Sequence, residues 1–599
     1  MRPIDVGEWR WVSGLAAVLL VLVAVPYAIA LLHPPEGYLL ARTLYYGNDL
    51  SQYLAAMGDG IASSSWLVHD HLTSEPHSPA LMYTLYVVMG KVAGLLGLPV
   101  IPLFAVVVAV STAALTFAAY SFSAAFLNRV RDRRTALILV LFGSGIGIWI
   151  AAAGVADPSA GDTGRGFAFH RAELSTYLLP FGPPHLTLGL ALLLVWGRAL
   201  AEWCWTGSTR TLLWLLLSTL GVGLVNSFSM ASLVAVSSSY ALVRWLQTAR
   251  FPLREVAASV LVGVVSAPLL VNSLLTFALN PFWGRTYGQQ NMTPSASPWV
   301  LAADLGVLLP LAVAGVIASK GRRESKLLLS VWFVTLAVAM YLPVSFQRRF
   351  GFGLQPALAV LAALGMGWLD SLVLARIALV RWRPLLMAVV STLAVSGAAL
   401  GYTLVVMASL GIGGLGQAVF EPAPNVEAAS WLADHSTPED VVLASVDTGN
   451  FLAGQIPGRV VAGHGAGTLD AERKQELVSS FFDPSATPTD RWRIAAESGA
   501  THIFLGPRER ALGGEPLPPK QGFQLVYDKG GVQIYRVGCL ATRGSIPAVP
   551  SSLPTGGDGW VPSLGHQRHC TTRMIIKAKQ YGAISQRGEP SGQMANPSR

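Results

Sequence analysis

The chain has 599 residues, of which 52% are hydrophobic and only 13% are charged. Soluble globular proteins carry about twice that charged fraction, so the composition excludes a soluble enzyme or regulatory domain. The net charge of +9 does not indicate nucleic-acid binding, because most Lys and Arg residues lie in short segments between apolar runs.

Long apolar runs recur between residues 11 and 411, and many have the roughly 18–25 residues that a helix needs to cross a bilayer. We expect about eleven spans. They are placed near residues 11–32, 99–127, 135–154, 183–203, 211–228, 230–246, 256–279, 298–318, 327–344, 354–372 and 385–411. The first run is too long for a signal peptide and no small-residue cleavage site follows it, so we expect it to be retained. The predicted fold class is a polytopic α-helical membrane protein.

The distribution of basic residues predicts the orientation of these spans. With the N-terminus in the cytoplasm, eighteen Lys and Arg residues fall in inner segments and seven in outer ones, as the positive-inside rule requires. This orientation needs residues 79–98 to lie along the outer surface as an interfacial helix instead of crossing the membrane. Residues 33–98 then form a long first outer loop, and the odd number of spans places the C-terminal region outside.

The first outer loop concentrates polar side chains near the membrane surface. Asp49 comes shortly after the first span, and Glu75 and His77 precede the interfacial helix. A carboxylate fixed at a membrane boundary is costly, so it usually has a chemical or structural task. The structural alternative is that Asp49 caps a helix over residues 50–57.

Two basic residues stand out in a later outer segment. Arg348 and Arg349 lie between two predicted spans on the outer side, against the positive-inside trend. Adjacent arginines in that place can hold a lipid phosphate bidentately. The alternatives are contact with lipid headgroups and pairing with an outer domain.

From about residue 420 the composition changes to short apolar strands between helices. We expect helices over 426–435, 469–482 and 491–498, strands over 441–445, 459–463 and 501–506, and a hairpin over 523–537 that turns at Gly530-Gly531. This alternation predicts a small extracytoplasmic α/β domain over residues 420–540, after a transmembrane domain over residues 1–415. Residues 541–599 are rich in Pro, Ser, Gly and Arg without periodicity, and we expect them to be disordered.

The order of these motifs resembles that of the GT-C superfamily. The shared pattern is an acidic residue soon after the first span, a His-Pro-like turn, an interfacial helix and a span that ends in basic residues. In the superfamily the turn reads like His-Pro-Pro-Leu-Tyr-Tyr, and the corresponding residues here are His77-Ser78-Pro79-Ala80-Leu81-Met82-Tyr83. GT-C proteins are polytopic glycosyltransferases that use polyprenyl-phosphate-linked sugars; they include protein O-mannosyltransferases and lipid A aminoarabinose transferases. Several of them carry an outer C-terminal α/β domain.

The resemblance implies a function and a set of site residues. A sugar would move from a polyprenyl-phosphate-linked donor to a glycan, lipid or protein acceptor at the outer face of a bacterial plasma membrane, with inversion. Asp49 would deprotonate the acceptor hydroxyl, and Glu173, close to the fourth span, would be a second acidic residue of the catalytic site. For Glu173 the alternative is an ordinary solvated loop. The substrate-binding residues would be Arg348, Arg349, His77, Glu75 and His185.

Two other classes of protein stay open: a transporter or lipid flippase, and a non-catalytic membrane scaffold. A conduit needs ionisable residues or broken helices at mid-membrane, often within internal repeats. Here the charges cluster in the outer loops, which favours an interfacial enzyme over a conduit, whereas nothing in the sequence excludes a scaffold. No cofactor is required by the sequence; the alternative is a divalent metal held by His69, His71 and His77 with Asp49 or Glu75.

Overall fold

The computed structural model describes residues 3–153, 173–290, 292–318, 323–374, 380–412, 419–465, 467–518 and 522–538. The chain divides into two compact units. Unit 1 comprises Met1–His69 and Ser78–Glu421, and unit 2 comprises Asp70–His77 and Pro422–Arg599. The tail expected over residues 541–599 lies outside the described residues.

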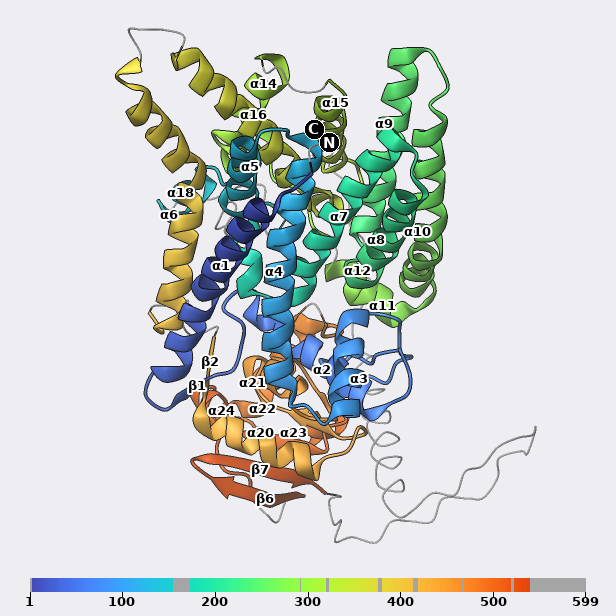
Figure 1. Ribbon diagram of the computed structural model, residues 1–599. Helices are drawn as coiled ribbons and strands as arrows, with labels where there is room; N and C mark the ends of the chain where they lie inside the picture. The colour runs from blue at the N-terminus through green and yellow to red at the C-terminus, as the bar shows by residue number, and fades with distance from the viewer. Residues whose placement is uncertain are drawn as a thin grey trace, which may run out of the picture. The chain divides into compact units, whose positions relative to one another are not determined.

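Unit 1 is built almost entirely of helices in its described residues. They are α1 (Val6–Leu32), α2 (Leu50–Ala62), α3 (Thr84–Leu96), α4 (Val100–Phe126), α5 (Val130–Phe142), α6 (Gly147–Ala152), α7 (Pro184–Thr206), α8 (Thr209–Val225), α9 (Ser229–Thr248), α10 (Leu253–Leu279), α11 (Pro281–Arg285), α12 (Tyr287–Gln290), α13 (Pro298–Leu305), α14 (Leu308–Ala318), α15 (Arg323–Ala339), α16 (Leu354–Leu374) and α18 (Arg383–Ser409). Short 3-10 segments are η1 (Gly47–Asp49), η4 (Thr176–Phe181) and η5 (Gln347–Gly351). The short strands β1 (Tyr38–Leu40) and β2 (Phe420–Pro422) form a two-stranded sheet. In Figure 1, α8, α9 and α10 lie side by side, and α1 lies next to α18.

Seven helical segments in the described part of the chain are long and apolar enough to cross a membrane, or eight if the bent pair α13 and α14 forms one span. That pair bends by 80°. Three predicted spans do not meet this criterion of length and apolar character. Helices α8 and α15 have only 17 residues each. The apolar sequence of α9 is interrupted by Ser237, Ser238 and Ser239. The multi-pass helical fold class is confirmed, while the number of about eleven spans stays a prediction.

The helices of unit 1 are tied together by a buried ionic cluster near the N-terminus. Asp5 and Glu8 form a capping box at the start of α1, with Glu8 N donating to Asp5 Oδ1 at 2.8 Å. The same Glu8 carboxylate accepts from Arg133 of α5 at 3.0 Å and from the Tyr120 hydroxyl of α4. The Glu8 and Arg133 side chains are almost fully buried. A charge buried at this depth needs a partner, so the cluster fixes α1, α4 and α5 in one register.

Helices α2 and α3 approach each other closely because glycines face each other at their contact. A Cβ added at Gly90 would meet Met57 O at 2.1 Å, and one added at Gly60 would meet Val87 O at 2.6 Å. Small residues allow this backbone contact where lipid supplies no hydrophobic force between helices. With 13 residues, α3 is shorter than the roughly 20 residues of a membrane span; its interfacial placement stays a prediction.

In the described part of unit 2 a five-stranded sheet has the order β4-β3-β5-β7-β6. Its strands are β3 (Val441–Leu443), β4 (Arg459–Val460), β5 (His502–Leu505), β6 (Phe523–Lys529) and β7 (Val532–Val537), and its helices are α20 (Ala423–His435), α21 (Val446–Ala453), α22 (Ala471–Phe482), α23 (Pro488–Glu497) and α24 (Pro507–Ala511). Strands β3, β4 and β5 are parallel, while β7 is antiparallel to both β5 and β6.

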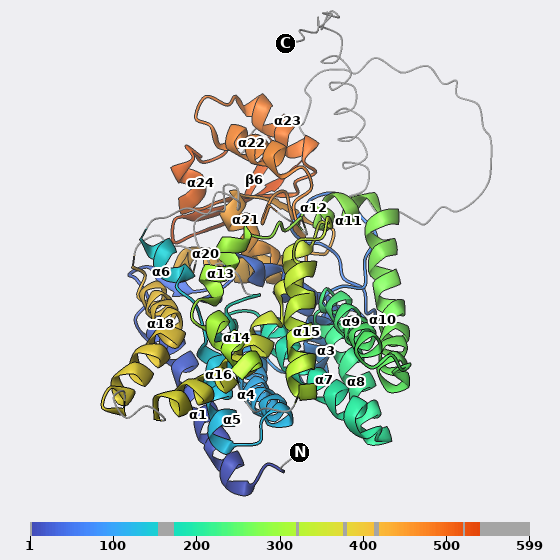
Figure 2. The same ribbon diagram turned by 90° about the horizontal axis from the view of Figure 1, so that it is seen from above.

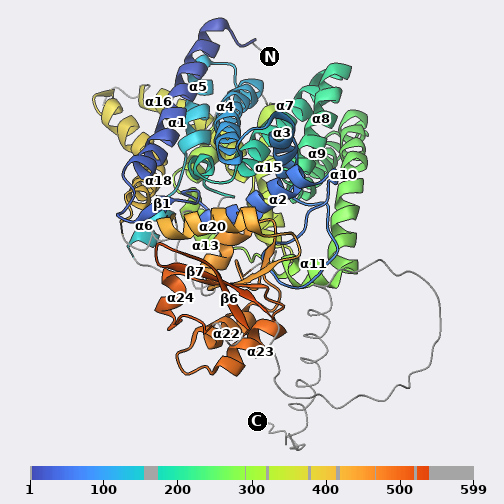
Figure 3. The same ribbon diagram turned by 90° about the horizontal axis from the view of Figure 1, so that it is seen from below.

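Helices cover both faces of this sheet. Figures 2 and 3 show the sheet between α20 on one face and α22 and α23 on the other. Leu443, Ile503 and Leu505 pack with Phe481 and Ile494 on the second face. Strands buried on both faces read as continuous apolar runs, which is why the sequence predicts them. The helices and strands expected between residues 426 and 537 are all present, with ends that differ by a few residues, whereas α21 and α24 were not expected.

Candidate active site

A cavity of about 160 Å³ lies within unit 1. Helices α2, α3, α7, α9, α12 and α16 each contribute lining residues at or just before their first turn. The lining residues are Tyr46, Asp49, Gln52, Tyr53, Met82, Tyr83, Glu173, Pro183, His185, Leu186, Asn226, Phe228, Ser229, Tyr287, Arg348, Arg349 and Phe352. The structure therefore brings together five of the predicted site residues: Asp49, Glu173, His185, Arg348 and Arg349.

Asp49 reaches the cavity from the junction between η1 and α2. Tyr46, before η1, adopts a left-handed backbone with φ of 54°, a conformation that is uncommon for a residue with a side chain. Arg42 Nη1 donates to Asn48 Oδ1 at 2.7 Å and supports the same turn. Asp49 is half-buried and occupies the N-cap position of α2, but its side chain makes no capping hydrogen bond to that helix. This geometry does not support the capping alternative.

Glu173 lies between the two arginines. Its Oε1 is 3.2 Å from Arg349 Nη1 and 3.4 Å from Arg348 Nε. The Glu173 side chain is only 2% exposed, whereas those of Arg348 and Arg349 are 27% and 29% exposed. Burial raises the pKa of Glu173, but the charges of Arg348 and Arg349 outweigh that effect and hold the pKa below its ordinary value. The carboxylate is therefore an ionised counter-ion, and Arg348 and Arg349 both pair with it.

The segment that carries the arginines is fixed by its backbone. Arg348 N donates to Thr293 O at 3.1 Å, and Thr293 N donates to Ser345 O at 2.8 Å. The guanidinium carbon of Arg349 lies 5.6 Å from the ring centroid of Phe228, in a cation–π contact. Both guanidinium groups consequently reach one wall of the cavity from η5, a short helical turn that hydrogen bonds to Thr293 fix in place.

Aromatic and amide side chains form much of the remaining wall. The Tyr83 hydroxyl donates to Gln52 Oε1 at 2.8 Å, and the Tyr83 ring lies 5.5 Å from that of Tyr53 and 6.2 Å from that of Tyr287. The Nδ1 atom of His185 is 2.8 Å from the Tyr86 hydroxyl. The sequence does not predict Gln52, Tyr53 and Tyr287 as lining residues, because they carry no charge that distinguishes them. Tyr83 is the last residue of the motif that begins at His77.

Glu75 and His77 belong to unit 2 and are not among the described residues that line the cavity. Glu75 pairs with Lys474 at 2.5 Å. The two ring nitrogens of His77 lie 2.8 Å from Asp70 N and 2.9 Å from Glu75 O, so the ring closes its own loop. The substrate-binding roles expected for Glu75 and His77 stay predictions that this geometry does not support.

Within the described residues, no three or more His, Cys, Asp or Glu side chains are grouped as metal ligands. The histidines proposed as ligands have other contacts: His71 Nδ1 lies 2.9 Å from Gly458 O, and His77 is engaged in its loop. The geometry therefore gives the divalent-metal alternative no support.

The solved structures that are similar to this chain over most of its length include two membrane proteins with different ligands. The oligosaccharyltransferase of Archaeoglobus fulgidus, tethered with an acceptor peptide containing the NVT sequon, matches with a TM-score of 0.50 and 13% identity, over 88% of this chain and 74% of that one. ArnT from Cupriavidus metallidurans, bound to undecaprenyl phosphate, matches with a TM-score of 0.50 and 14% identity, over 87% of this chain and 98% of that one. Neither a protein-family model nor a curated protein matches the sequence.

At sequence identities this low, the structural matches establish a shared fold. The second match extends over nearly all of the ArnT chain. The chain therefore shares its fold with these two proteins, as the resemblance of its early motifs to the GT-C superfamily implies.

Proposed function

We propose that this protein is a glycosyltransferase that moves a sugar from a polyprenyl-phosphate carrier to an acceptor hydroxyl at the outer face of a bacterial plasma membrane. The observation that carries the proposal is the cavity of unit 1, where Asp49 shares one enclosure with Arg348, Arg349 and Glu173. Among the structural neighbours, ArnT is bound to undecaprenyl phosphate, and the archaeal oligosaccharyltransferase is tethered with an acceptor peptide.

The arginine wall suits the phosphate of the carrier. Arg348 and Arg349 present planar guanidinium groups that match phosphate oxygens in pairs. Helices α2, α7, α9 and α16 all begin at the cavity. A helix N-terminus carries a partial positive charge that favours an anion. Two independent sources of positive potential therefore act on the same small space.

Glu173 serves this wall as a counter-ion. It is nearly fully buried and contacts both guanidinium groups, so it holds them together when the carrier is absent. An incoming phosphate competes with the carboxylate for the same nitrogen atoms. We therefore assign Glu173 a positioning role toward the arginines, in place of the direct catalytic role expected from the sequence.

Asp49 is the group that we assign to the chemical step. The acceptor hydroxyl oxygen attacks the anomeric carbon and forms the new glycosidic bond, while the bond from that carbon to the phosphate oxygen breaks. The electron pair leaves with the polyprenyl phosphate, and the hydroxyl proton passes to the Asp49 carboxylate. Direct displacement inverts the anomeric centre. No strong acid is needed, because the leaving phosphate is already a stabilised anion held by arginines.

The aromatic wall is suited to the sugar. The rings of Tyr53, Tyr83 and Tyr287 offer flat apolar faces, while the Gln52 amide and the tyrosine hydroxyls can bond to sugar hydroxyls. Apart from the ion cluster and Asp49, the lining side chains are uncharged or, for His185, held by a neutral tyrosine hydroxyl.

Binding of undecaprenyl phosphate to the purified protein in lipid nanodiscs tests the first half of the proposal. Arg348→Gln and Arg349→Gln should each weaken binding by about tenfold, or about 1.4 kcal/mol. Arg285→Gln is the matched control, because Arg285 is an exposed arginine of α11 that does not line the cavity. Equal affinity in all three variants would contradict the phosphate site.

Release of polyprenyl phosphate tests the second half. Short-chain polyprenyl-phosphate hexoses are incubated with the protein and an envelope extract that supplies acceptors. Asp49→Asn should reduce release by at least a hundredfold, the usual scale for loss of a general base, and leave undecaprenyl phosphate affinity unchanged. Full release by Asp49→Asn would remove the catalytic assignment.

A further inference from the structure

The segment Asp70–His77 lies in the first outer loop of the sequence but belongs to the C-terminal unit of the structure. Thr73 pairs with Ala462 in an isolated antiparallel bridge, and Val460 N donates to His71 O at 3.0 Å. Arg459 Nη1 donates to Ser74 O at 2.8 Å. The segment thereby runs along the open edge of β4 and satisfies backbone groups that an edge strand otherwise exposes.

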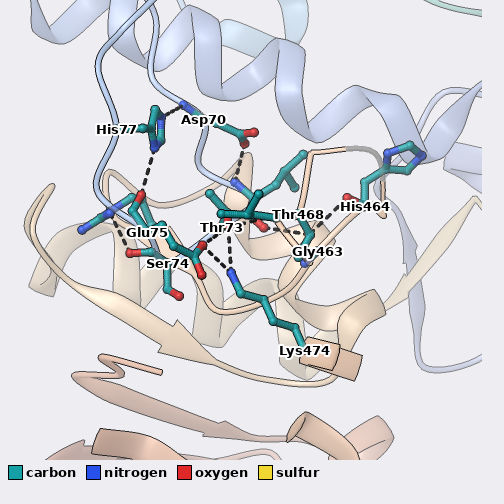
Figure 4. Close-up of polar contacts among 12 residues, drawn as sticks. Asp70, Thr73, Ser74, Glu75, His77, Gly463, His464, Thr468 and Lys474 are labelled. Carbon is teal, nitrogen blue, oxygen red and sulfur yellow. Dashed lines mark hydrogen bonds and ion pairs between the residues drawn. The ribbon is translucent and has the colours of Figure 1, made fainter. Parts of the chain in front are cut away.

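A saturated polar cluster holds this segment (Figure 4). The fully buried Thr73 hydroxyl donates to Glu75 Oε2, and it accepts from Lys474 Nζ at 2.7 Å and from Leu469 N at 3.3 Å. Lys474 Nζ also donates to Glu75 Oε2 at 2.5 Å. Lys474 is buried, so its charge requires these partners.

Leu72 lies next to the same cluster. Its side chain packs into a pocket formed by Gly463, Gly467 and Thr468. A Cβ added at Gly463 would meet Leu72 Cδ2 at 2.7 Å, and one added at Gly467 would meet Leu72 Cδ1 at 2.5 Å. The Thr468 hydroxyl donates to Leu72 O at 2.9 Å and accepts from Gly463 N at 3.0 Å. The loop of unit 2 around His464 is thus shaped to receive this one side chain.

The ends of the segment continue into a hydrogen-bonded neck in unit 1. Val68 N donates to Ala80 O at 2.9 Å, and Ala80 N donates to Val68 O at 3.0 Å. Trp283 Nε1 donates to Ser78 O at 2.8 Å, and Ala80 packs with Trp283 and Tyr287. Tyr287 lines the cavity, so hydrogen bonds and packing contacts connect the ends of the segment to the aromatic wall.

We propose that Lys474 is a positioning residue for the aromatic wall of the cavity, acting through Thr73 and Glu75 on the loop that ends at Tyr83. Within unit 2, the Lys474 cluster holds the segment Asp70–His77 in place. The hydrogen bonds between Val68 and Ala80 then restrict the position of Tyr83 and of its neighbour Tyr287. The constraint itself is a property of the fold; only its effect on sugar transfer rests on the function proposed above.

Hydrogen exchange of the full-length protein in nanodiscs tests the constraint directly. Lys474→Met keeps the length of the side chain and removes its charge, and Glu75, whose side chain is 36% exposed, returns to water. Exchange at the amides of Val68 and Ala80 should accelerate at least tenfold, while exchange in β3 and β5 stays unchanged. Lys474→Arg should restore protection at the neck.

Lys529→Met is the matched control. Lys529 pairs with Glu427 within unit 2, but both side chains are at least half exposed and lie outside the cluster. It should leave the neck unaltered. Thr73→Val is the second test variant, and it removes only the hydroxyl. It should accelerate exchange at Val68 and Ala80 as Lys474→Met does. It keeps the test decisive if Lys474→Met loosens unit 2 as a whole.

Transfer measurements separate this proposal from the proposed function. Lys474→Met should lower polyprenyl phosphate release by about tenfold through kcat, with undecaprenyl phosphate affinity within twofold of the parent protein. Unchanged neck exchange in both Lys474→Met and Thr73→Val would overturn the positioning role. If the parent protein fails to release or bind the carrier, the proposed function fails, and the exchange result still decides the positioning role.

Discussion

Glu173 and its two arginines show how one carboxylate can set the electrostatics of a cavity. Removing its charge while keeping its shape tests this arrangement. In Glu173→Gln the amide oxygen remains as a neutral acceptor for Arg348 and Arg349, so the guanidinium groups stay in place without a competing anion. Undecaprenyl phosphate should bind about tenfold more tightly, or about 1.4 kcal/mol. Titration of the carrier measures this; weaker binding would show that the charge of Glu173 is needed to hold the arginines.

The same carboxylate predicts an acid limit to stability. Its folded pKa lies below the ordinary value of about 4.3, because the arginine charges outweigh burial. A depressed carboxyl pKa contributes stability that is fully present above the unfolded value and is lost as the pH falls through the folded value. The Tm difference between the parent protein and Glu173→Gln should be constant from pH 7 to pH 5 and shrink below about pH 4. A difference that changes between pH 7 and pH 5 would contradict the assignment.

At this scale the sequence predicts the charged part of the site and misses the rest. Asp49, Glu173, Arg348 and Arg349 stand out because a charge near a membrane is costly and therefore rare. Gln52, Tyr53 and Tyr287 cannot be found in this way, since amide and aromatic residues are ordinary at a membrane interface. Only the three-dimensional structure shows that these side chains surround one enclosure.

Among the elements, α2 and α3 pack closely together, and residues on or beside both helices line the cavity. Helix α2 carries Gln52 and Tyr53, and Tyr83 precedes α3. Gly90→Ala should force the two helices apart, because its Cβ would lie 2.1 Å from Met57 O. We expect a loss of about 1–3 kcal/mol in unfolding free energy, as for overpacking, and a fall in transfer. Thermal unfolding and polyprenyl phosphate release measure the two effects.

The same helix offers a control for that substitution. A Cβ at Gly94 would meet Ile61 Cα at 3.6 Å, which is an ordinary contact distance. Gly94→Ala should therefore be tolerated. Equal losses in both variants would show that the close approach at Gly90 is not what makes its substitution costly.

The sequence predicts the secondary structure better than the connections and contacts between its elements. Continuous apolar runs reveal the strands of unit 2 because both faces of the sheet are covered. The 80° bend between α13 and α14 is invisible in the apolar pattern, since residues on both sides of it are equally hydrophobic. The placement of Asp70–His77 against Lys474 is likewise beyond local pattern, because it depends on pairing across 401 positions.

For the molecule as a whole, the proposed chemistry requires the cavity to face the outer side of the membrane. In a cysteine-free background, Glu36→Cys lies in the predicted first outer loop and Ser208→Cys in a predicted inner segment, and both positions are exposed. A membrane-impermeant maleimide added to spheroplasts should label the first and not the second. The opposite labelling would reverse the orientation and place the cavity in the cytoplasm.

The grip of unit 2 on Asp70–His77 also sets an order of events in synthesis. Thr73 leaves the ribosome about 400 residues before Lys474, its partner. At roughly 5–20 residues per second, that interval is on the order of 20–80 s. Throughout this time the early loop has no strand to join, and the neck at Val68 and Ala80 lacks its distal anchor. A nascent or C-terminally truncated chain can therefore insert its helices while the aromatic wall lacks this restraint, so under the proposed positioning role full sugar transfer waits for the synthesis of unit 2.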